Sequence, residues 1–487
     1  MTATTAMTLA LLTPVVGACV IGLLDRLPNA REAATLMTAS ALFICVWQLL
    51  DPVLAGARPA WTALEMMPGL PLAWRVEPLG LLFALVASAL WIVNSAYSIG
   101  YLRANAERHQ TRFYVCFALA LAATIGIAFA ANLLTLFLCY ELLTLVTYPL
   151  VTHAGSPEAR RAGRLYLGML VGSSVLLMLP AIVYVWYNAG TTEFRAGGIL
   201  ASDTSATAVT AALACFVFGI GKAALMPVHR WLPAAMVAPT PVSALLHAVA
   251  VVKAGVFCIV KIAVGVFGID RLAGQTTWLA LVAGFTALSA AVVALRADNL
   301  KRRLAYSTVS QLAYIVLAVS LTNVLSVIGA ALHIATHAVG KITLFFAAGS
   351  IYTAAHKTAV SELAGIGRQM PWTMAAFAIA ALSLVGVPPL AGFVSKWSML
   401  AGAAHAPDYA ALAVFGLGTL LSAAYLLPIV YTAFFDSAPA TAARQCHGEA
   451  PWPMLLATLA GAGGCLALIV CAEPLLRLAR ALADSAF

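Results

Sequence analysis

Fourteen apolar runs follow one another along the chain, and they constrain the fold more than any other feature of the sequence. A membrane-spanning helix needs about 20 consecutive apolar residues, and most of the runs reach this length. They predict an all-α polytopic membrane protein with about 14 transmembrane helices, for which the lipid bilayer is the solvent of most of the surface. The runs lie near 5–24, 32–50, 78–100, 113–130, 132–152, 163–187, 209–226, 241–266, 275–296, 303–321, 323–350, 372–400, 409–435 and 452–475.

The few charged residues support this prediction. Only 9% of the 487 residues are charged, against about 25% in a typical soluble domain. The net charge of +9 comes from basic residues in short loops between apolar runs, and this placement argues against a nucleic-acid partner. Nine cysteines are scattered singly, with no CxxC or Cys/His cluster. The sequence therefore predicts no metal site and no cofactor in this chain.

Basic residues divide the connections between runs into two classes. Those after even-numbered runs hold only Arg58, Arg75, Arg195 and Arg271. Those after odd-numbered runs hold Arg26, Arg31, Arg103, Arg108, Arg112, Arg160, Arg161, Arg164, Arg230, Arg296, Lys301, Arg302, Arg303, Lys357, Arg368 and Arg444. The positive-inside rule places the richer class in the cytoplasm. We therefore expect a multi-pass protein of the inner (plasma) membrane with both termini on the outer, periplasmic side. The first run lacks a basic n-region, so we expect a retained span and no cleaved signal.

Ionisable residues inside the apolar runs are the candidates for function. Glu141 is the one acid of eighteen that lies away from the loops and span ends, where a charge costs about 2.5–3.5 kcal/mol by insertion scales. Five of the seven lysines lie within runs, four of them away from span ends, and these four outnumber the single acid, so static pairing does not account for all of them. These are Lys222, Lys253, Lys341 and Lys396. Lys261 lies nearer a span end, where snorkelling is a sufficient explanation.

Histidines extend the set. His333, His337 and Lys341 follow one another at intervals of four residues, so on a helix they form one stripe. Imidazole both accepts and donates protons near neutral pH. A lone histidine is more often a satisfied core residue, but three titratable groups in one stripe favour a relay. His247 and Lys253 are six residues apart, so they do not share a helical face.

Two runs are interrupted by glycine and proline. The segment Gly219 to Pro227 contains Lys222, and the segment Gly386 to Lys396 contains two adjacent prolines. Proline removes a backbone donor and kinks a helix, and freed backbone groups in a bilayer must face protein or water. A single proline kink would be explained by simple bending of the helix. Two breaks that each hold a lysine instead favour the discontinuous helices of transporters.

Four motifs, in this order, give the chain a family resemblance. They are Pro227-Val-His-Arg-Trp231-Leu-Pro233 with Ala238-Pro-Thr-Pro-Val-Ser-Ala-Leu-Leu-His247, then Asp298 to Gln311, His333 to Lys341, and Gly386 to Lys396. Over roughly residues 75–435 the chain resembles the antiporter-like subunits of respiratory complex I. That family includes the large Mrp cation/proton antiporter subunits and membrane subunits of energy-converting hydrogenases.

The resemblance implies an organisation and a path. It implies two inverted five-helix repeats and two broken helices, with boundaries at 1–112 (helices 1–3), 113–270 (helices 4–8), 271–435 (helices 9–13) and 436–487 (helix 14). It also implies that Glu141 and Lys222 form a tunable pair. His247 and Lys253 would link toward the centre, His333, His337 and Lys341 would continue the axis, and Lys396 would be the terminal proton donor or acceptor.

The sequence departs from the family pattern at positions that bear on which subfamily the chain belongs to. Ala234 stands where members often have aspartate, and Tyr140 where tryptophan is frequent. Lys396 differs from the glutamate of one complex I branch. Neither Ala234 nor Tyr140 removes a titratable group of the axis. The length is closer to the D-type Mrp subunit or the smaller complex I paralogues than to the largest complex I subunit.

The expected function is translocation of protons or cations within a multi-subunit complex, most like an Mrp-type monovalent cation/proton antiporter. The expected partners are the bilayer and other membrane subunits of an Mrp-, complex I- or hydrogenase-like assembly, and protons and sodium are the candidate ions. The alternatives are a proton-pumping subunit of a complex I-like NADH-quinone oxidoreductase or membrane hydrogenase, the proton-driven subunit of an inorganic carbon uptake complex, and a scaffold without conduction. Any redox chemistry would lie in partner chains.

Overall fold

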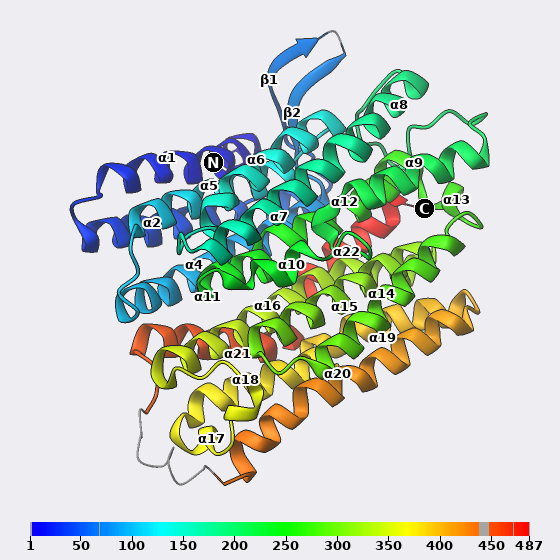
Figure 1. Ribbon diagram of the computed structural model, residues 1–487. Coiled ribbons are helices and arrows are strands. Elements are labelled where there is room, and N and C mark those ends of the chain that lie inside the picture. The colour runs from blue at the N-terminus through cyan, green and yellow to red at the C-terminus, as the bar shows by residue number, and fades with distance from the viewer. Residues whose placement is uncertain (1, 68, 438–447, 471, 487) are drawn as a thin grey trace.

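The computed structural model describes residues 2–67, 69–437, 448–470 and 472–486. Its helices lie side by side along one direction and form a bundle (Figure 1). The predicted loop near 436–450, with Arg444, lies largely outside the described residues. The fold is that of a mostly helical, multi-pass membrane protein.

Eleven helical segments of the described chain are long and apolar enough to cross a membrane. Each coincides with one of the predicted runs. They are α1 (Ala3–Leu23); α2 (Pro28–Trp47) with α3 (Leu50–Leu54); α4 (Pro78–Ala104); α5 (Gln110–Ala128); α6 (Leu133–Val151); α7 (Pro157–Ser173) with η1 (Ser174–Met178) and α8 (Leu179–Ala189); α11 (Thr240–Ala244) with η4 (Leu245–Val249), α12 (Val251–Ile262) and η5 (Ala263–Phe267); α14 (Thr277–Arg296); α16 (Val324–Ala355); α20 (Tyr409–Phe435); and α21 (Trp452–Val470).

The other three predicted runs are helical but shorter or more polar. Helix α9 (Ala206–Gly219) and helix α18 (Pro371–Val385) each stop at a break, and α19 (Ala391–His405) follows the second break. Helix α15 (Leu300–Ser320) begins with Lys301, Arg302 and Arg303, which lower its hydropathy. Short helices fill the remaining connections: η2 (Gly221–Ala223), α10 (Trp231–Ala234), η3 (Ala235–Val237), α13 (Ile269–Leu272), η6 (Val360–Glu362) and α17 (Ile366–Gln369).

A β-hairpin corrects the prediction of an all-α chain. Strands β1 (Ala60–Met67) and β2 (Leu70–Arg75) pair antiparallel and project from one end of the bundle (Figure 1). Trp61 stacks on Trp74 at 5.3 Å, and Gly69 takes the positive φ of +77° at the turn. The strands are shorter than the window that detects a membrane span, so hydropathy does not register them.

The C-terminal run also differs from its prediction. Helix α21 ends at Val470, and a separate helix α22 (Glu473–Ala486) follows. Helix α22 contacts α4 and α16 and buries Leu478, Ala479 and Leu482. Its apolar residues recur at helical spacing on one face, so it is amphipathic and packs along the bundle.

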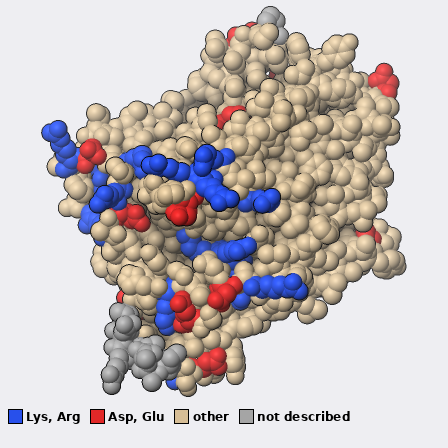
Figure 2. Space-filling view, viewed as in Figure 1, with Lys and Arg blue, Asp and Glu red and all other residues tan. Residues whose placement is uncertain are grey.

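The basic side chains are distributed unevenly over the surface. On the visible face, Lys and Arg gather at the left-hand end, whereas the right-hand part is almost free of them (Figure 2). This asymmetry matches the sequence, in which connections rich in basic residues alternate with connections that hold few. It supports the grouping of connections into two sides of the bundle.

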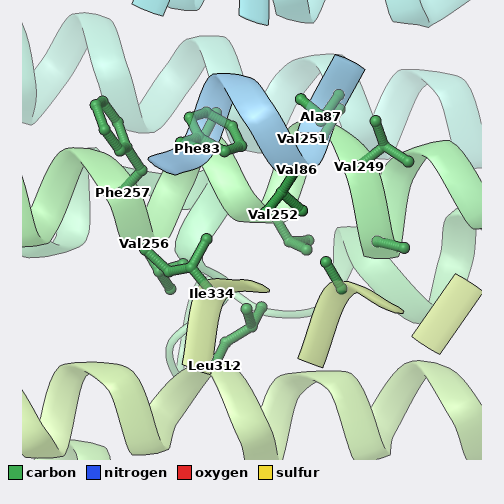
Figure 3. Packing of buried hydrophobic residues seen from close by; sticks show 14 of the residues in the cluster. Phe83, Val86, Ala87, Val249, Val251, Val252, Val256, Phe257, Leu312 and Ile334 are labelled. Carbon is green, nitrogen blue, oxygen red and sulfur yellow. The ribbon is translucent and has the colours of Figure 1, made fainter. Parts of the chain in front are cut away.

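Helix α12 occupies the centre of the bundle. Its apolar side chains, among them Val252, Val256 and Phe257, lie between Phe83 of α4 on one side and Ile334 of α16 on the other (Figure 3). The rings of Phe83 and Phe257 are 5.0 Å apart. Because this region is densely packed with apolar groups, any polar side chain within it must find its partners inside the protein.

Candidate functional site

The first broken helix places Lys222 inside the bundle. Helix α9 ends at Gly219, the single turn η2 carries Lys222, and Ala224 leaves the helical region at φ 54°. The indole Nε1 of Trp231 donates to the carbonyl oxygen of Gly221 at 2.9 Å, so a side chain satisfies one of the backbone groups that the break frees. Helix α12 lies directly against this segment at Gly255, where a Cβ atom would be 2.2 Å from the nitrogen of Ala223.

Lys222 is held by neutral groups of α6. Its side chain is fully buried, and Nζ donates to the carbonyl oxygen of Tyr140 at 2.8 Å and to Oγ1 of Thr144 at 2.5 Å. Nζ also lies 3.2 Å from the centroid of the Tyr140 ring. Glu141 makes no ion pair with Lys222, although both residues are described. Oxygen Oε1 of the half-buried Glu141 is buried and has no hydrogen-bond partner among the described residues. The predicted pair is therefore near but not in contact.

The candidate relay, a row of buried lysine, histidine and polar side chains, crosses the centre of the bundle. Nζ of Lys253 on α12 lies 2.6 Å from Nδ1 of His337 on α16. The rings of His337 and His333 are 5.6 Å apart. His333 then contacts Oγ of Ser395 on α19 at 2.9 Å and Oε1 of Gln311 on α15 at 3.1 Å. Hydrogen-bonding side chains thus connect four helices, α12, α15, α16 and α19.

His247 and Lys341 flank this relay without joining it. His247 lies in the π-helical turn η4, its ring is 4.7 Å from that of Phe345, and neither ring nitrogen has a hydrogen-bond partner among the described residues. Lys341 donates to the carbonyl oxygen of Leu304 at 3.0 Å and to the hydroxyl of Ser307. The stripe predicted on α16 exists, but its lysine turns to α15.

The second break resembles the first. Helix α18 ends at Val385, Gly386 has a positive φ of 91°, and α19 begins at Ala391. Nζ of the buried Lys396 donates to the carbonyl oxygen of Val385 at 3.1 Å. It also lies 5.5 Å from the centroid of the Tyr314 ring. In each break, therefore, a buried lysine donates to a main-chain carbonyl near an aromatic ring: Lys222 to Tyr140 within α6, and Lys396 to Val385 at the end of α18.

Several polar partners were missed by the reasoning from sequence. They are the neutral side chains Tyr140, Thr144, Ser307, Gln311 and Ser395, which bind the buried lysines and histidines. A signal was present, because Tyr140 and Thr144 are one helical turn apart and Ser395 adjoins Lys396. Hydroxyl groups carry no charge, however, so they do not stand out in an apolar run.

The interpretation of Lys261 as a snorkelling side chain is wrong. Its side chain is 3% exposed, and Nζ lies 3.1 Å from Oε2 of Glu77. The same carboxylate pairs with Arg75 at 2.9 Å. Lys261 is therefore buried at the hairpin end of the bundle and paired with an acid from the start of another span.

Comparison with known proteins identifies the family. The family described as "NADH:quinone oxidoreductase/Mrp antiporter, TM" matches residues 130–422, which include every candidate residue of the relay and both breaks. The chain belongs to this family. It is 33% identical over 398 residues to the NADH-quinone oxidoreductase subunit N of Desulforudis audaxviator (strain MP104C), covering 79% of this chain and 77% of that protein.

Two further proteins extend the comparison. The A/B subunit of a probable K(+)/H(+) antiporter of Rhizobium meliloti (strain 1021) is 29% identical over 441 residues, covering 87% of this chain but only 43% of that protein. The structure of the Mrp complex from Dietzia sp. DQ12-45-1b contains a chain that superposes with a TM-score of 0.87 at 22% identity, covering 100% of this chain and 98% of that chain. The fold is therefore that of an antiporter-like membrane subunit.

Proposed function

We propose that this antiporter-like subunit moves protons along a row of buried groups from Glu141 through Lys222, Lys253, His337 and His333 to Lys396, with His247 and Lys341 beside it. The observation that carries the proposal is the 2.6 Å contact between Lys253 and His337. An ammonium that donates to a neutral imidazole shares one proton between two bases, and this is the elementary step of a relay.

The connections along the row differ in kind. Lys253, His337, His333 and Ser395 are linked by contacts or neighbouring rings. Between Glu141 and Lys222, between Lys222 and Lys253, and between His333 and Lys396, no hydrogen bond is present among the described residues. In the proposal, protons cross these three gaps through water or by side-chain rotation. The arrival of a charge at one position then changes the affinity of the next for a proton.

The proposal includes the organisation of the chain. Fourteen spans would divide into helices 1–3 (1–112), two inverted five-helix repeats (113–270 and 271–435) and helix 14 (436–487). The two breaks support the repeats, because each places a buried lysine against a main-chain carbonyl, Lys222 in the first and Lys396 in the second. Both termini would lie on the outer side of the inner membrane.

The branch that we propose is a monovalent cation/proton antiporter of Mrp type, which works with other membrane subunits. The 29% identity to a chain of a probable K(+)/H(+) antiporter over 87% of this chain supports it. Lys396 in place of a glutamate is a second support.

The second candidate function is proton pumping along the same row of residues, driven by electron transfer in partner chains. It is favoured by the 33% identity to an NADH-quinone oxidoreductase subunit, since that match covers 77% of the relative. The two candidates differ in their partners. Iron–sulfur subunits that co-purify in mild detergent would indicate the redox assembly, and their absence together with Na⁺- or K⁺-dependent proton movement would indicate the antiporter.

The test is proton movement in inverted membrane vesicles that contain the chain with its native partners. Lys253→Met and His337→Ala should each reduce ion-dependent quenching of a ΔpH dye by a factor on the order of 100, the lower range for a positioned proton-transfer group. Lys357→Met and His405→Ala are matched controls, because both residues lie outside the relay. Normal transport in both relay variants, at normal protein levels, would refute the proposal.

A further inference from the structure

A cavity of about 330 Å³ opens at the hairpin end of the bundle, away from the relay. One wall is the start of the α4 span, at Pro78 and Leu79, and another is the η5 turn at the end of the span Thr240–Phe267, at Val264 and Gly265. Both walls are the ends of membrane-spanning segments. The cavity therefore lies at the depth where lipid headgroups meet the hydrocarbon core.

Four basic residues line this cavity against a single acid. They are Arg58, Arg75, Arg195 and Lys261, and the acid is Glu77. All three arginines lie in the connections after even-numbered runs, which hold only four basic residues in the whole sequence. Positive charge is scarce on this side of the membrane, yet three of those four residues line one cavity.

The carboxylates do not balance the four cations. Outside the lining, Oε2 of Glu193 lies 3.9 Å from Nη2 of Arg195. Glu77 accepts from Nη2 of Arg75 at 2.9 Å and lies 3.1 Å from Nζ of Lys261. Nζ of Lys261 is buried, and none of its N–H groups has a well-aligned hydrogen-bond acceptor among the described residues. Burial alone would raise the pKa of Glu77, but Lys261 and Arg75 outweigh it and hold this pKa below its usual value. Glu77 is thus ionised at neutral pH, and the lining residues still carry a net positive charge.

The backbone around the cavity is fixed by hydrogen bonds. The N–H of Arg195 donates to the carbonyl of Gly265 at 3.1 Å, and the N–H of Arg75 donates to that of Phe129 at 2.7 Å. The guanidinium of Arg75 is further held by the carbonyl oxygen of Phe194 at 2.5 Å. The guanidinium of Arg75 is therefore positioned before any ligand arrives, which lowers the entropic cost of binding.

We propose that this cavity binds the phosphate group of an anionic phospholipid. Arginine recognises phosphate oxygens through its planar fork of N–H donors, and Lys261 supplies a point charge deeper in the cavity. The apolar wall formed by Pro78, Leu79 and Val264 suits the glycerol backbone and the first methylene groups. Free phosphate has the same charged group but would make no use of this wall.

The test measures lipid binding to the full-length protein, purified with its native partners in a mild detergent. Native mass spectrometry follows a titration with phosphatidylglycerol, with phosphatidylcholine or inorganic phosphate in parallel. The variant Arg58→Gln/Arg195→Gln should bind phosphatidylglycerol about 30-fold more weakly than wild type, from roughly five- to sixfold per lost basic residue near a membrane surface. Its thermal midpoint without lipid should equal that of wild type, because Arg195 is 63% exposed and Arg58 is also exposed.

The matched control is Arg160→Gln/Arg161→Gln, which removes the same charge at exposed positions away from the cavity. The proposal is overturned if the cavity variant binds phosphatidylglycerol like wild type, or if the control loses affinity equally. Binding of phosphatidylglycerol without binding of inorganic phosphate assigns the site to the lipid. Equal occupation by inorganic phosphate assigns the same site to the free anion.

Discussion

Gly255 lies where α12 touches the segment that carries Lys222, and the gap there is too narrow for a side chain. A Cβ atom would be 2.2 Å from the nitrogen of Ala223 and 2.4 Å from the carbonyl carbon of Lys222. Both are backbone atoms, so no rotamer change relieves the clash. To reach an ordinary contact of 3.4 Å, the segment must move by about 1.2 Å. The hydrogen bonds of Lys222 to Tyr140 and Thr144 do not survive a shift of that size.

Gly255→Ala is therefore expected to impair transport without touching a titratable group. Overpacking of this kind costs about 1–3 kcal/mol, and a misplacement of about 1 Å can reduce a positioned step by about 10²-fold. The assay is ΔpH formation in inverted vesicles, together with the thermal midpoint of the purified protein. Gly168→Ala on α7 is the control, since a Cβ there meets nothing within 4 Å. Wild-type transport and an unchanged midpoint in Gly255→Ala would refute the reasoning.

Two more outcomes follow from particular contacts. Tyr140→Phe removes only the hydroxyl that accepts a hydrogen bond from the backbone N–H of Lys222 at 3.2 Å, so it should lower stability by about 1–3 kcal/mol and leave transport largely intact. Tyr140→Leu also removes the contact between the ring and Lys222, worth about 2 kcal/mol when desolvated, and should lower transport as well. Equal transport in the two variants would contradict the role of the ring. In the loop after α6, burial, Arg112 and His109 lower the pKa of His153 to about 4. Only the unfolded chain then takes up a proton as the pH falls from about 6.5 to about 4, and stability should drop by up to about 3 kcal/mol over this range. His153→Gln should flatten that dependence, measured as the difference in thermal midpoint between pH 7 and pH 5, and an unchanged slope would contradict it.

The membrane-spanning helices were largely predictable from sequence, because the bilayer imposes one requirement on every span. Long apolar runs had to become helices with internally satisfied backbones, and each of the predicted runs is helical. The hairpin β1–β2 and helix α22 do not span the bilayer, so this requirement says nothing about them. Helix α22 is amphipathic, and its partners α4 and α16 lie far away in the sequence.

The candidate site was predictable in its residue types but not in its pairing. Spacing on one helix is local, so the neighbourhood of His333 and His337 followed from their interval of four. The contact of Lys253 with His337 joins residues 84 positions apart, and no local pattern encodes it. On α6, Tyr140 and Thr144 share a face, whereas Glu141 is turned by about 100°. This rotation gives Lys222 neutral partners where a charge pair was expected.

The hairpin β1–β2 has a practical consequence for work on this protein. It is a protrusion with stacked tryptophans at its base and with strand β1 almost wholly exposed. A chain of 50.7 kDa that is surrounded by detergent offers few external landmarks for aligning images in electron cryo-microscopy. An antibody fragment raised against the hairpin would supply one, and loop tips of this kind tolerate insertion well. The same protrusion would report sidedness in intact cells, since an epitope grafted there is readable only from the side to which it projects.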